Sequence, residues 1–268
     1  MRRTWLFVPG ADERAHAAAA KSRADVIILD LEDFTPPELR AKARTLSPDT
    51  LDLWRKAGAV AAVRINPLET SGHDDLIGVL AARPDMILLS KVATPAQVKA
   101  LEAATGGAVD LVPNVESAAG LMRTFDIAKA SKRVVAMLVA SEDMVADLGT
   151  RRSRGGKELA YVRSRFLVEC RAAGVDAIDC PFTFSDVEGA VADARYAKRL
   201  GYRMKSLVVP SHAKAVNAVF TPTRAQLKKA KRIVAAFEKA RAAGKDRAEV
   251  DGALIELPIY TAAKRLLG

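Results

Sequence analysis

Cysteine and histidine are scarce in this 268-residue sequence. The two cysteines, Cys170 and Cys180, are too few for a disulfide framework and lack the spacing of metal ligands. The three histidines, His16, His73 and His212, show no H-x-H or H-E-x-x-H spacing, which argues against a zinc site. A reducing cytoplasm is therefore the simplest expected location.

Long hydrophobic runs are also missing. No apolar stretch approaches the roughly 20 residues that a membrane-spanning helix needs. The N-terminal segment MRRTWLFVPGADER has an apolar run of only five residues before Gly10, which is too short for a secretory signal. We therefore expect no membrane partner.

Apolar residues make up half of the sequence, in short β-rich runs separated by longer alanine-rich amphipathic stretches. Eight runs are expected to be strands: 4–8, 26–31, 60–66, 85–91, 109–114, 133–140, 175–180 and 204–209. Strands that are apolar on both faces and alternate with helices are typical of a parallel sheet covered by helices. The pattern predicts an α/β fold, a (β/α)8 TIM barrel over residues 1–220. A doubly wound open sheet is the alternative, although no G-x-G-x-x-G follows the first strand.

Residues 221–268 show a different pattern. Helical periodicity over 223–242 and 258–266, joined by GKDRAEVDG, predicts a C-terminal helical extension that packs on a neighbouring subunit. Eight basic residues and one acidic residue lie between Thr221 and Lys245, and they account for most of the net charge of +10. This segment is either a solvated helix face or a surface that attracts and binds a phosphorylated partner. It lacks interleaved aromatic residues, so we expect no nucleic-acid partner.

Charged residues gather where the predicted strands end. The stretch VIILDLEDFTP runs a strand into Asp30, Glu32 and Asp33, which repel one another unless a positive charge lies among them. Further charged residues end or follow later strands: Arg64, Lys91, Glu116, Glu142, Asp143 and Asp179. Parallel strands bring these ends to one face, the barrel mouth. Converging carboxylates predict a divalent cation with oxygen ligands, most simply Mg²⁺.

The same residues also have structural explanations. Asp143 is placed to cap one helix, and Glu116 is placed in the first turn of another. Arg64 and Lys91 can form ion pairs at the mouth, and Lys91 can alternatively form a Schiff base. Capping alone explains carboxylates at five strand ends poorly.

Nearly the whole chain resembles a known family. It carries, in order, LFVPG, ADVIILDLED, VRINP, LLSKV, VPNVESAAGL, SEDMVADLG, GKELAYVRSR, RAAGVDAID and NAVFTP. This series resembles the HpcH/HpaI aldolase and citrate lyase family, on its CitE-like branch. The resemblance implies a Mg²⁺-dependent (β/α)8 barrel, commonly a homotrimer. It also implies cleavage or formation of 3-hydroxyacyl thioesters such as malyl-, citramalyl- or citryl-CoA, with a 2-oxo acid and an acyl-CoA as the products.

The resemblance also implies roles for single residues. Glu116 and Asp143 match the direct metal ligands. Arg64 matches the arginine that holds the substrate's carboxylate or oxo group, and Glu32 and Asp33 match the pair that orders water around the metal ion.

Further roles follow from the same resemblance. Ala140, Ser141 and Glu142, directly before Asp143, match substrate-binding positions. Glu256 stands where the family has an aspartate that moves a proton at the thioester α-carbon.

Several positions depart from the family pattern. Ala140 replaces a usual glycine, and Ser90 replaces a usual proline. Val209 and His212 change the segment after the eighth strand, and Glu256 is longer than the usual aspartate by one methylene. None of these changes removes a predicted metal ligand, but each bears on which acyl group fits.

Three functions are therefore considered. The leading one is a Mg²⁺-dependent lyase acting on a CoA thioester or acyl-carrier substrate. The others are a CoA-free class II aldolase acting on 2-oxo acids and a non-catalytic barrel subunit. The basic segment favours the first over the second, and intact Arg64, Glu116 and Asp143 argue against the third.

Overall fold

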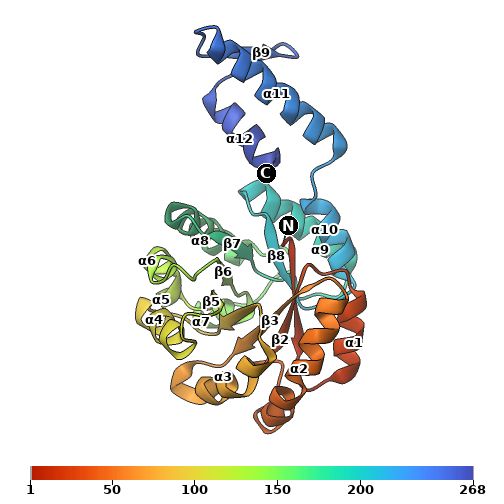
Figure 1. Ribbon diagram of the computed structural model, residues 1–268, viewed down its shortest axis with the longest axis vertical. Helices are drawn as coiled ribbons and strands as arrows, with labels where there is room; N and C mark the ends of the chain where they lie inside the picture. Colours follow the sequence, from red (N-terminus) through yellow and green to blue (C-terminus); the bar gives the residue numbers. More distant parts are fainter. Residues whose placement is uncertain (1, 268) are drawn as a thin grey trace. The chain divides into compact units, whose positions relative to one another are not determined.

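The computed structural model describes residues 2–267 and contains a closed barrel of eight parallel strands (Figure 1). The strands are β1 (Thr4–Pro9), β2 (Val26–Asp30), β3 (Val60–Ile65), β4 (Met86–Leu89), β5 (Asp110–Val115), β6 (Ala136–Val139), β7 (Asp176–Asp179) and β8 (Met204–Leu207). Each strand pairs with the next, and β8 pairs with β1 to close the sheet. The predicted TIM barrel is confirmed, and the open-sheet alternative is wrong.

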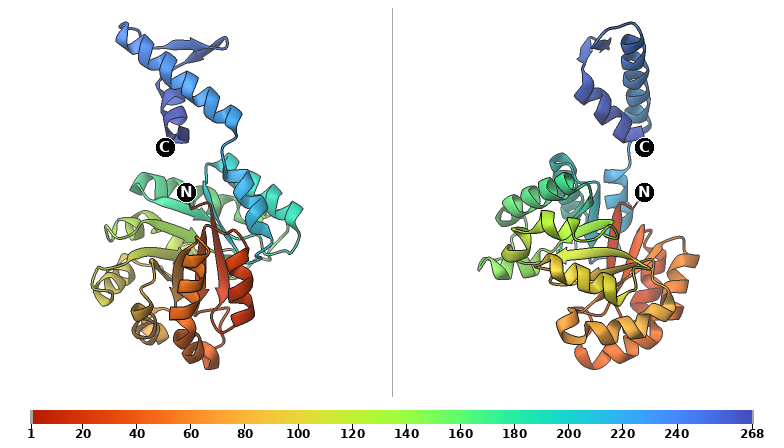
Figure 2. Two further views of the ribbon diagram at one scale, coloured as in Figure 1. Left: turned by 45° about the vertical axis from the view of Figure 1, so that its right-hand side comes forward. Right: turned by 60° about the vertical axis from the view of Figure 1, so that its left-hand side comes forward.

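Helices follow the strands and lie outside them (Figures 1 and 2). They are α1 (Glu13–Lys21), α2 (Arg40–Lys56), α3 (His73–Val79), α4 (Pro95–Ala104), α5 (Ala118–Leu121), α6 (Thr124–Lys129), α7 (Glu142–Asp147), α8 (Ala160–Ala173), α9 (Val187–Leu200) and α10 (His212–Phe220). Side chains cap several of them: Asp12 accepts from the backbone N–H groups of Arg14 and Ala15 at the start of α1. Within residues 2–267, no helix combines the length and apolar character needed to cross a membrane.

Alternate side chains of each strand point in opposite directions and build two apolar layers. The inner layer fills the barrel with Trp5, Phe7, Val26, Ile28, Ala62, Met86, Leu88, Val112, Ala136, Leu138 and Ile178. The outer layer packs the strands against the helices, as where Leu29 of β2 shares a cluster with Trp54 of α2. The strands are therefore apolar on both faces because both faces are buried.

A buried ion network joins β7 and β8 to the surrounding helices. Asp179 lies 2.6 Å from Arg163 Nη2 and 2.6 Å from Lys205 Nζ. Asp193 of α9 contacts the same two cations, at 2.8 and 2.5 Å. The expectation that Asp179 joins the barrel mouth was wrong, because Ile178 takes the inward position and the next side chain points outward.

The chain divides into two compact units, Met1–Phe220 and Thr221–Gly268. The second unit contains α11 (Arg224–Ala242), β9 (Ala248–Val250), β10 (Ala253–Ile255) and α12 (Leu257–Leu267). It has a small core of its own, in which the Phe237 and Tyr260 rings stack with their centroids 4.6 Å apart. Both helices of the second unit were predicted from the sequence.

The hairpin of β9 and β10 was not predicted. Asp251 and Gly252 form its turn, with φ angles of 55° and 72°. An Asp-Gly pair is typical of two-residue hairpin turns because both positions need positive φ. The signal was present, but strands of three residues are too short to show an alternating pattern.

Asp179→Asn is expected to lower the free energy of unfolding by about 3–5 kcal/mol, because Arg163 and Lys205 stay buried after losing a charged partner. Chemical denaturation measures the change. Asp176→Asn is the matched control on the same strand: Asp176 pairs with the part-exposed Arg203, so about 1 kcal/mol or less should be lost. Equal losses in the two variants would contradict a structural role for the network.

Candidate active site

A buried ion pair lies at the ends of β2 and β3. Arg64 donates from Nε to Asp30 Oδ1 at 2.7 Å and from Nη2 to Asp30 Oδ2 at 2.5 Å. The two residues are also register partners in the sheet, so the strand pairing itself sets this two-point contact. Asp30 is fully buried, and Arg64 is 6% exposed. The guanidinium is therefore held in one orientation.

The third nitrogen of Arg64 faces the other carboxylates of the mouth. Nη1 lies 3.0 Å from Glu32 and 3.8 Å from both Asp33 and Glu116. Lys91 Nζ binds Glu32 and lies 3.5 Å from Asp33. The positive charges that the acidic stretch after β2 requires are therefore Arg64 and Lys91.

This environment shifts the pKa values of the mouth residues. Burial raises the pKa of Glu32, with the charge of Arg64 acting against it. Burial acts to raise the pKa of Asp33 too, but the hydrogen bond with Glu32 and the nearby cations outweigh it and lower that pKa. The pKa of Lys91 is raised although burial opposes this, because Glu32 and its acidic neighbours hold the ammonium. Lys91 is therefore a charged ion-pair partner, which argues against the Schiff-base alternative.

Glu116, directly after β5, is a carboxylate with few partners. It is 3% exposed, and within residues 2–267 neither Oε1 nor Oε2 accepts a hydrogen bond. Burial raises the pKa of Glu116 to about 8, and the charges of Glu32 and Asp143 add to the increase while Arg64 opposes it. Burial and the charge of Asp33 likewise raise the pKa of Asp143, in the first turn of α7. Glu116 and Asp143 therefore lie in the same part of the mouth, and nearby positive charges neutralise them only in part.

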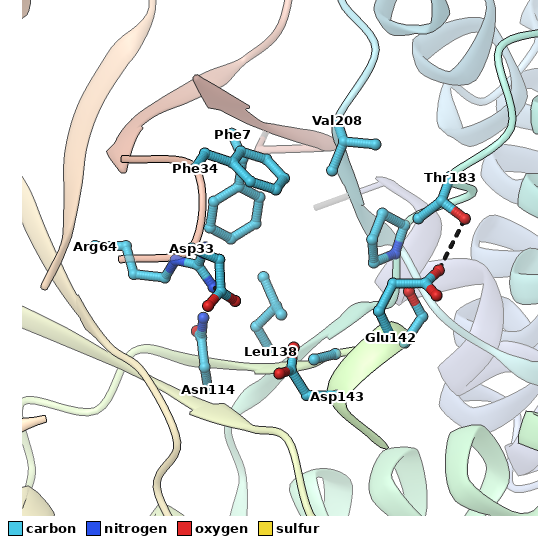
Figure 3. A pocket seen from close by; sticks show the side chains of 13 residues that line it. Phe7, Asp33, Phe34, Arg64, Asn114, Leu138, Glu142, Asp143, Thr183 and Val208 are labelled. Carbon is cyan, nitrogen blue, oxygen red and sulfur yellow. Dashed lines mark hydrogen bonds and ion pairs between the residues drawn. The ribbon is translucent and has the colours of Figure 1, made fainter. Parts of the chain in front are cut away.

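A cavity of about 430 Å³ opens beside these charges (Figure 3). The charged side chains that line it are Asp33, Arg64, Glu142 and Asp143. Much of the remaining lining is apolar: Phe7, Phe34, Leu138, Ala140, Pro181 and Val208. The Arg64 guanidinium lies 4.7 Å from the centroid of the Phe7 ring, which is a cation–π contact. The cavity suits an organic acid with an apolar portion.

The turn between β6 and α7 lines the same cavity. Ala140 is half-buried, and the buried Ser141 has an Oγ without a partner among the described residues. Glu142 is exposed and accepts a hydrogen bond from Thr183 Oγ1 at 2.9 Å. All three residues therefore border the cavity, and their substrate-binding roles remain predictions.

Other residues that the sequence singled out do not line the cavity. Glu256 is an exposed residue of the second unit, where its carbonyl accepts from the first turn of α12. His212 is buried and bonds the Ser185 carbonyl at 3.0 Å. Val208, and not Val209, lines the cavity. Ser90 Oγ donates a hydrogen bond to the Ile65 carbonyl.

Phe7, Phe34 and Asn114 were missed as cavity residues. Phe7 and Asn114 lie inside predicted strands, whose side chains were expected to belong to the barrel core. A signal for Asn114 existed, because an amide in the apolar run LVPNV lies two residues before Glu116 and therefore on the same strand face.

Comparison with known proteins agrees with this geometry. The family model described as HpcH/HpaI aldolase/citrate lyase matches residues 3–210. Citrate lyase subunit beta from Leuconostoc mesenteroides subsp. cremoris is 32% identical, over 100% of this chain and 92% of its own. A (3S)-malyl-CoA thioesterase from Cereibacter sphaeroides is 32% identical, over 98% of this chain and 93% of its own.

A solved structure agrees as well. CitE from Mycobacterium tuberculosis, in complex with magnesium, acetoacetate and coenzyme A, superposes with a TM-score of 0.80 at 29% identity. The match covers 99% of this chain and 96% of that one. The predicted resemblance is thereby confirmed, and the chain belongs to the HpcH/HpaI aldolase/citrate lyase family of carbon–carbon lyases.

Proposed function

We propose that this chain is a Mg²⁺-dependent lyase that cleaves, or in reverse forms, a 3-hydroxyacyl thioester such as malyl-, citramalyl- or citryl-CoA. The products are a 2-oxo acid and an acyl-CoA. The observation that carries the proposal is Glu116: neither of its two buried oxygens accepts a hydrogen bond within residues 2–267, and it lies near Arg64 and Asp143. Such a carboxylate is costly to bury unless a cation binds it.

The donor set fits Mg²⁺. Glu116 and Asp143 offer carboxylate oxygens. Within residues 2–267, no group of three or more His, Cys, Asp or Glu side chains is arranged to hold a metal ion by itself. Mg²⁺ is usually held by one or two carboxylates and keeps water or substrate oxygens as its other ligands. Bound there, the ion would act as a Lewis acid toward the substrate's hydroxyl and carboxylate.

The chain's own residues supply the remaining charge. Cleavage needs a base that takes the proton of the substrate hydroxyl; the carbon–carbon bond beside it then breaks, and the oxygen becomes the oxo group of the 2-oxo acid. The electron pair moves to the thioester α-carbon, where an acid must deliver a proton. Arg64 Nη1, held in place through Asp30, would stabilise the negative charge on the substrate oxygen. Glu32 and Asp33 would order solvent beside it.

The thioester part of the proposal is supported by the relatives, whose names include citrate lyase and malyl-CoA thioesterase, and by the CoA-bound CitE structure. The basic residues between Thr221 and Lys245 are all exposed, and they are therefore available to the phosphates of CoA or of an acyl carrier. The direct test incubates the protein and Mg²⁺ with malyl-, citramalyl- and citryl-CoA. Release of acetyl-CoA supports the proposal. Turnover of CoA-free aldol substrates alone would favour the class II aldolase.

Asp143→Ala should abolish Mg²⁺ binding and activity while the barrel stays folded, because Glu116 alone cannot hold the ion. Isothermal titration calorimetry measures binding, and circular dichroism checks the fold. Glu142→Gln is the matched control, since it removes a neighbouring charge that is not assigned to the metal. A folded Asp143→Ala protein that still binds Mg²⁺ would refute the ligand assignment.

Arg64→Lys should lose most turnover although the charge is kept. A lysine cannot hold both oxygens of Asp30 and also present a nitrogen to the cavity. Steady-state kinetics and thermal unfolding should be measured together. Near wild-type turnover would mean that Arg64 is only an ion-pair partner.

We also propose that the chain forms a trimer in which Glu256 of one copy serves the mouth of a neighbour. Glu256→Gln and Asp143→Ala, each inactive alone, should then recover activity when their subunits are exchanged, in up to about a quarter of the sites. Asp143→Ala mixed with Arg64→Lys is the control, because both residues border one cavity and no mixed site is intact. Exchange without recovery would place Glu256 outside any shared site, and an active Glu256→Gln enzyme would remove it from catalysis.

A further inference from the structure

The amide of Asn114 is buried at the cavity without a hydrogen-bond partner among residues 2–267. Asn114 lies on β5, is 0% exposed and lines the cavity, and neither Nδ2 nor Oδ1 is bonded within the described residues. Figure 3 shows the amide pointing into the cavity, toward Arg64 and Asp33. Its register partner on β6 is Leu138, which offers it no polar group.

Another buried asparagine of the barrel has two hydrogen-bond acceptors for its side-chain nitrogen. Asn66, 4% exposed and just after β3, donates from Nδ2 to the Leu31 carbonyl at 2.8 Å and to Asp75 at 2.7 Å. A buried amide without partners destabilises the fold, because its hydration is lost and nothing replaces it. Asn114 is therefore poorly explained as a packing residue, and it is well explained as a group that a ligand completes.

The surroundings define the chemistry of that ligand. Arg64 and Asp143 line the same cavity as Asn114, and Glu116 lies 3.8 Å from Arg64 Nη1. Asn114 precedes Glu116 by two residues, at the end of β5. The amide offers one neutral donor and one neutral acceptor side by side. A 2-hydroxycarboxylate offers the complement: a carboxylate oxygen that accepts and a hydroxyl that donates.

We propose that Asn114 binds the 2-hydroxy acid half of the substrate, with Nδ2 donating to the carboxylate and Oδ1 accepting from the hydroxyl. This inference rests on the proposed function. Cleavage converts the hydroxyl to an oxo group, which cannot donate to Oδ1. Asn114 therefore distinguishes the hydroxy acid half from the 2-oxo acid product, and it favours release of the product.

Asn114→Leu is the decisive variant because leucine has a similar volume and no polar atom. It should raise the midpoint of thermal unfolding by about 2–4 °C, since an unsatisfied group is removed. The same substitution at Asn66 is the matched control and should lower the midpoint, because it removes the side-chain donor to the buried Leu31 carbonyl and one of the donors to Asp75. A fall in Asn114→Leu comparable to that in Asn66→Leu would overturn the proposal.

Binding and kinetics complete the test. With Mg²⁺ present, lactate and pyruvate serve as probes of the hydroxy and oxo forms, and each should raise the unfolding midpoint of the wild type, lactate more. Asn114→Leu should lose the preference for lactate, and it should raise KM for the cleaved thioester about 10- to 100-fold, the range of one or two hydrogen bonds to a charged group.

Each part of the test can fail separately. Unchanged KM and probe binding in Asn114→Leu would overturn the assignment and leave the lyase proposal intact. So would a wild type that binds neither probe while it cleaves a thioester. A wild type that cleaves no thioester, but whose preference for lactate depends on Asn114, would instead contradict the proposed function and support the assignment.

Discussion

The contact between Arg64 and Asp30 is the interaction on which the barrel mouth depends. Three acidic residues follow the apolar core of β2, and Glu116 approaches them from β5, so the mouth would repel itself without a buried cation. Arg64 supplies that cation from the neighbouring strand, and the sheet register aligns it with Asp30. Two of its nitrogens are occupied by Asp30, which leaves Nη1 for Glu32, Glu116 and the cavity. The same residue thus neutralises the strand end and presents a charge to a ligand.

The backbone around Asp30 is built to hold this contact. The Gly10 N–H donates to the Asp30 carbonyl at 3.0 Å and to Thr35 Oγ1 at 2.8 Å, which joins the end of β1 to the turn after β2. A side chain at position 10 would place its Cβ 2.7 Å from the Asp30 carbonyl oxygen. Glycine in the VPG motif is therefore required by a close backbone approach, and not by the turn alone.

The sequence predicted the elements better than the directions of their side chains. Eight apolar runs were enough to predict the barrel, and the shared face of parallel strand ends was enough to predict that Arg64 and Glu116 meet. Alternation along a strand has a period of two, so an error of one residue turns a side chain from the mouth to the helix layer. Asp179 was misplaced for this reason. The sequence does not show that the Asn114 amide lacks partners, because this depends on which residues of β6 lie beside it.

Hydrogen bonds and ion pairs to buried polar side chains distinguish structural residues from candidate ligand-binding residues at the strand ends. Asp179 is as buried as Asn114, but it lies between two cations and contributes to the packing of β7 and β8. Asn114 lies on β5 and Glu116 directly follows this strand, and neither side chain has a hydrogen-bond partner within residues 2–267. A fold that gives Asp179 two cations and Asn66 Nδ2 two acceptors has the means to pair these two side chains as well. That it leaves these two neighbouring side chains unpaired supports the proposal that both bind a ligand at the end of β5.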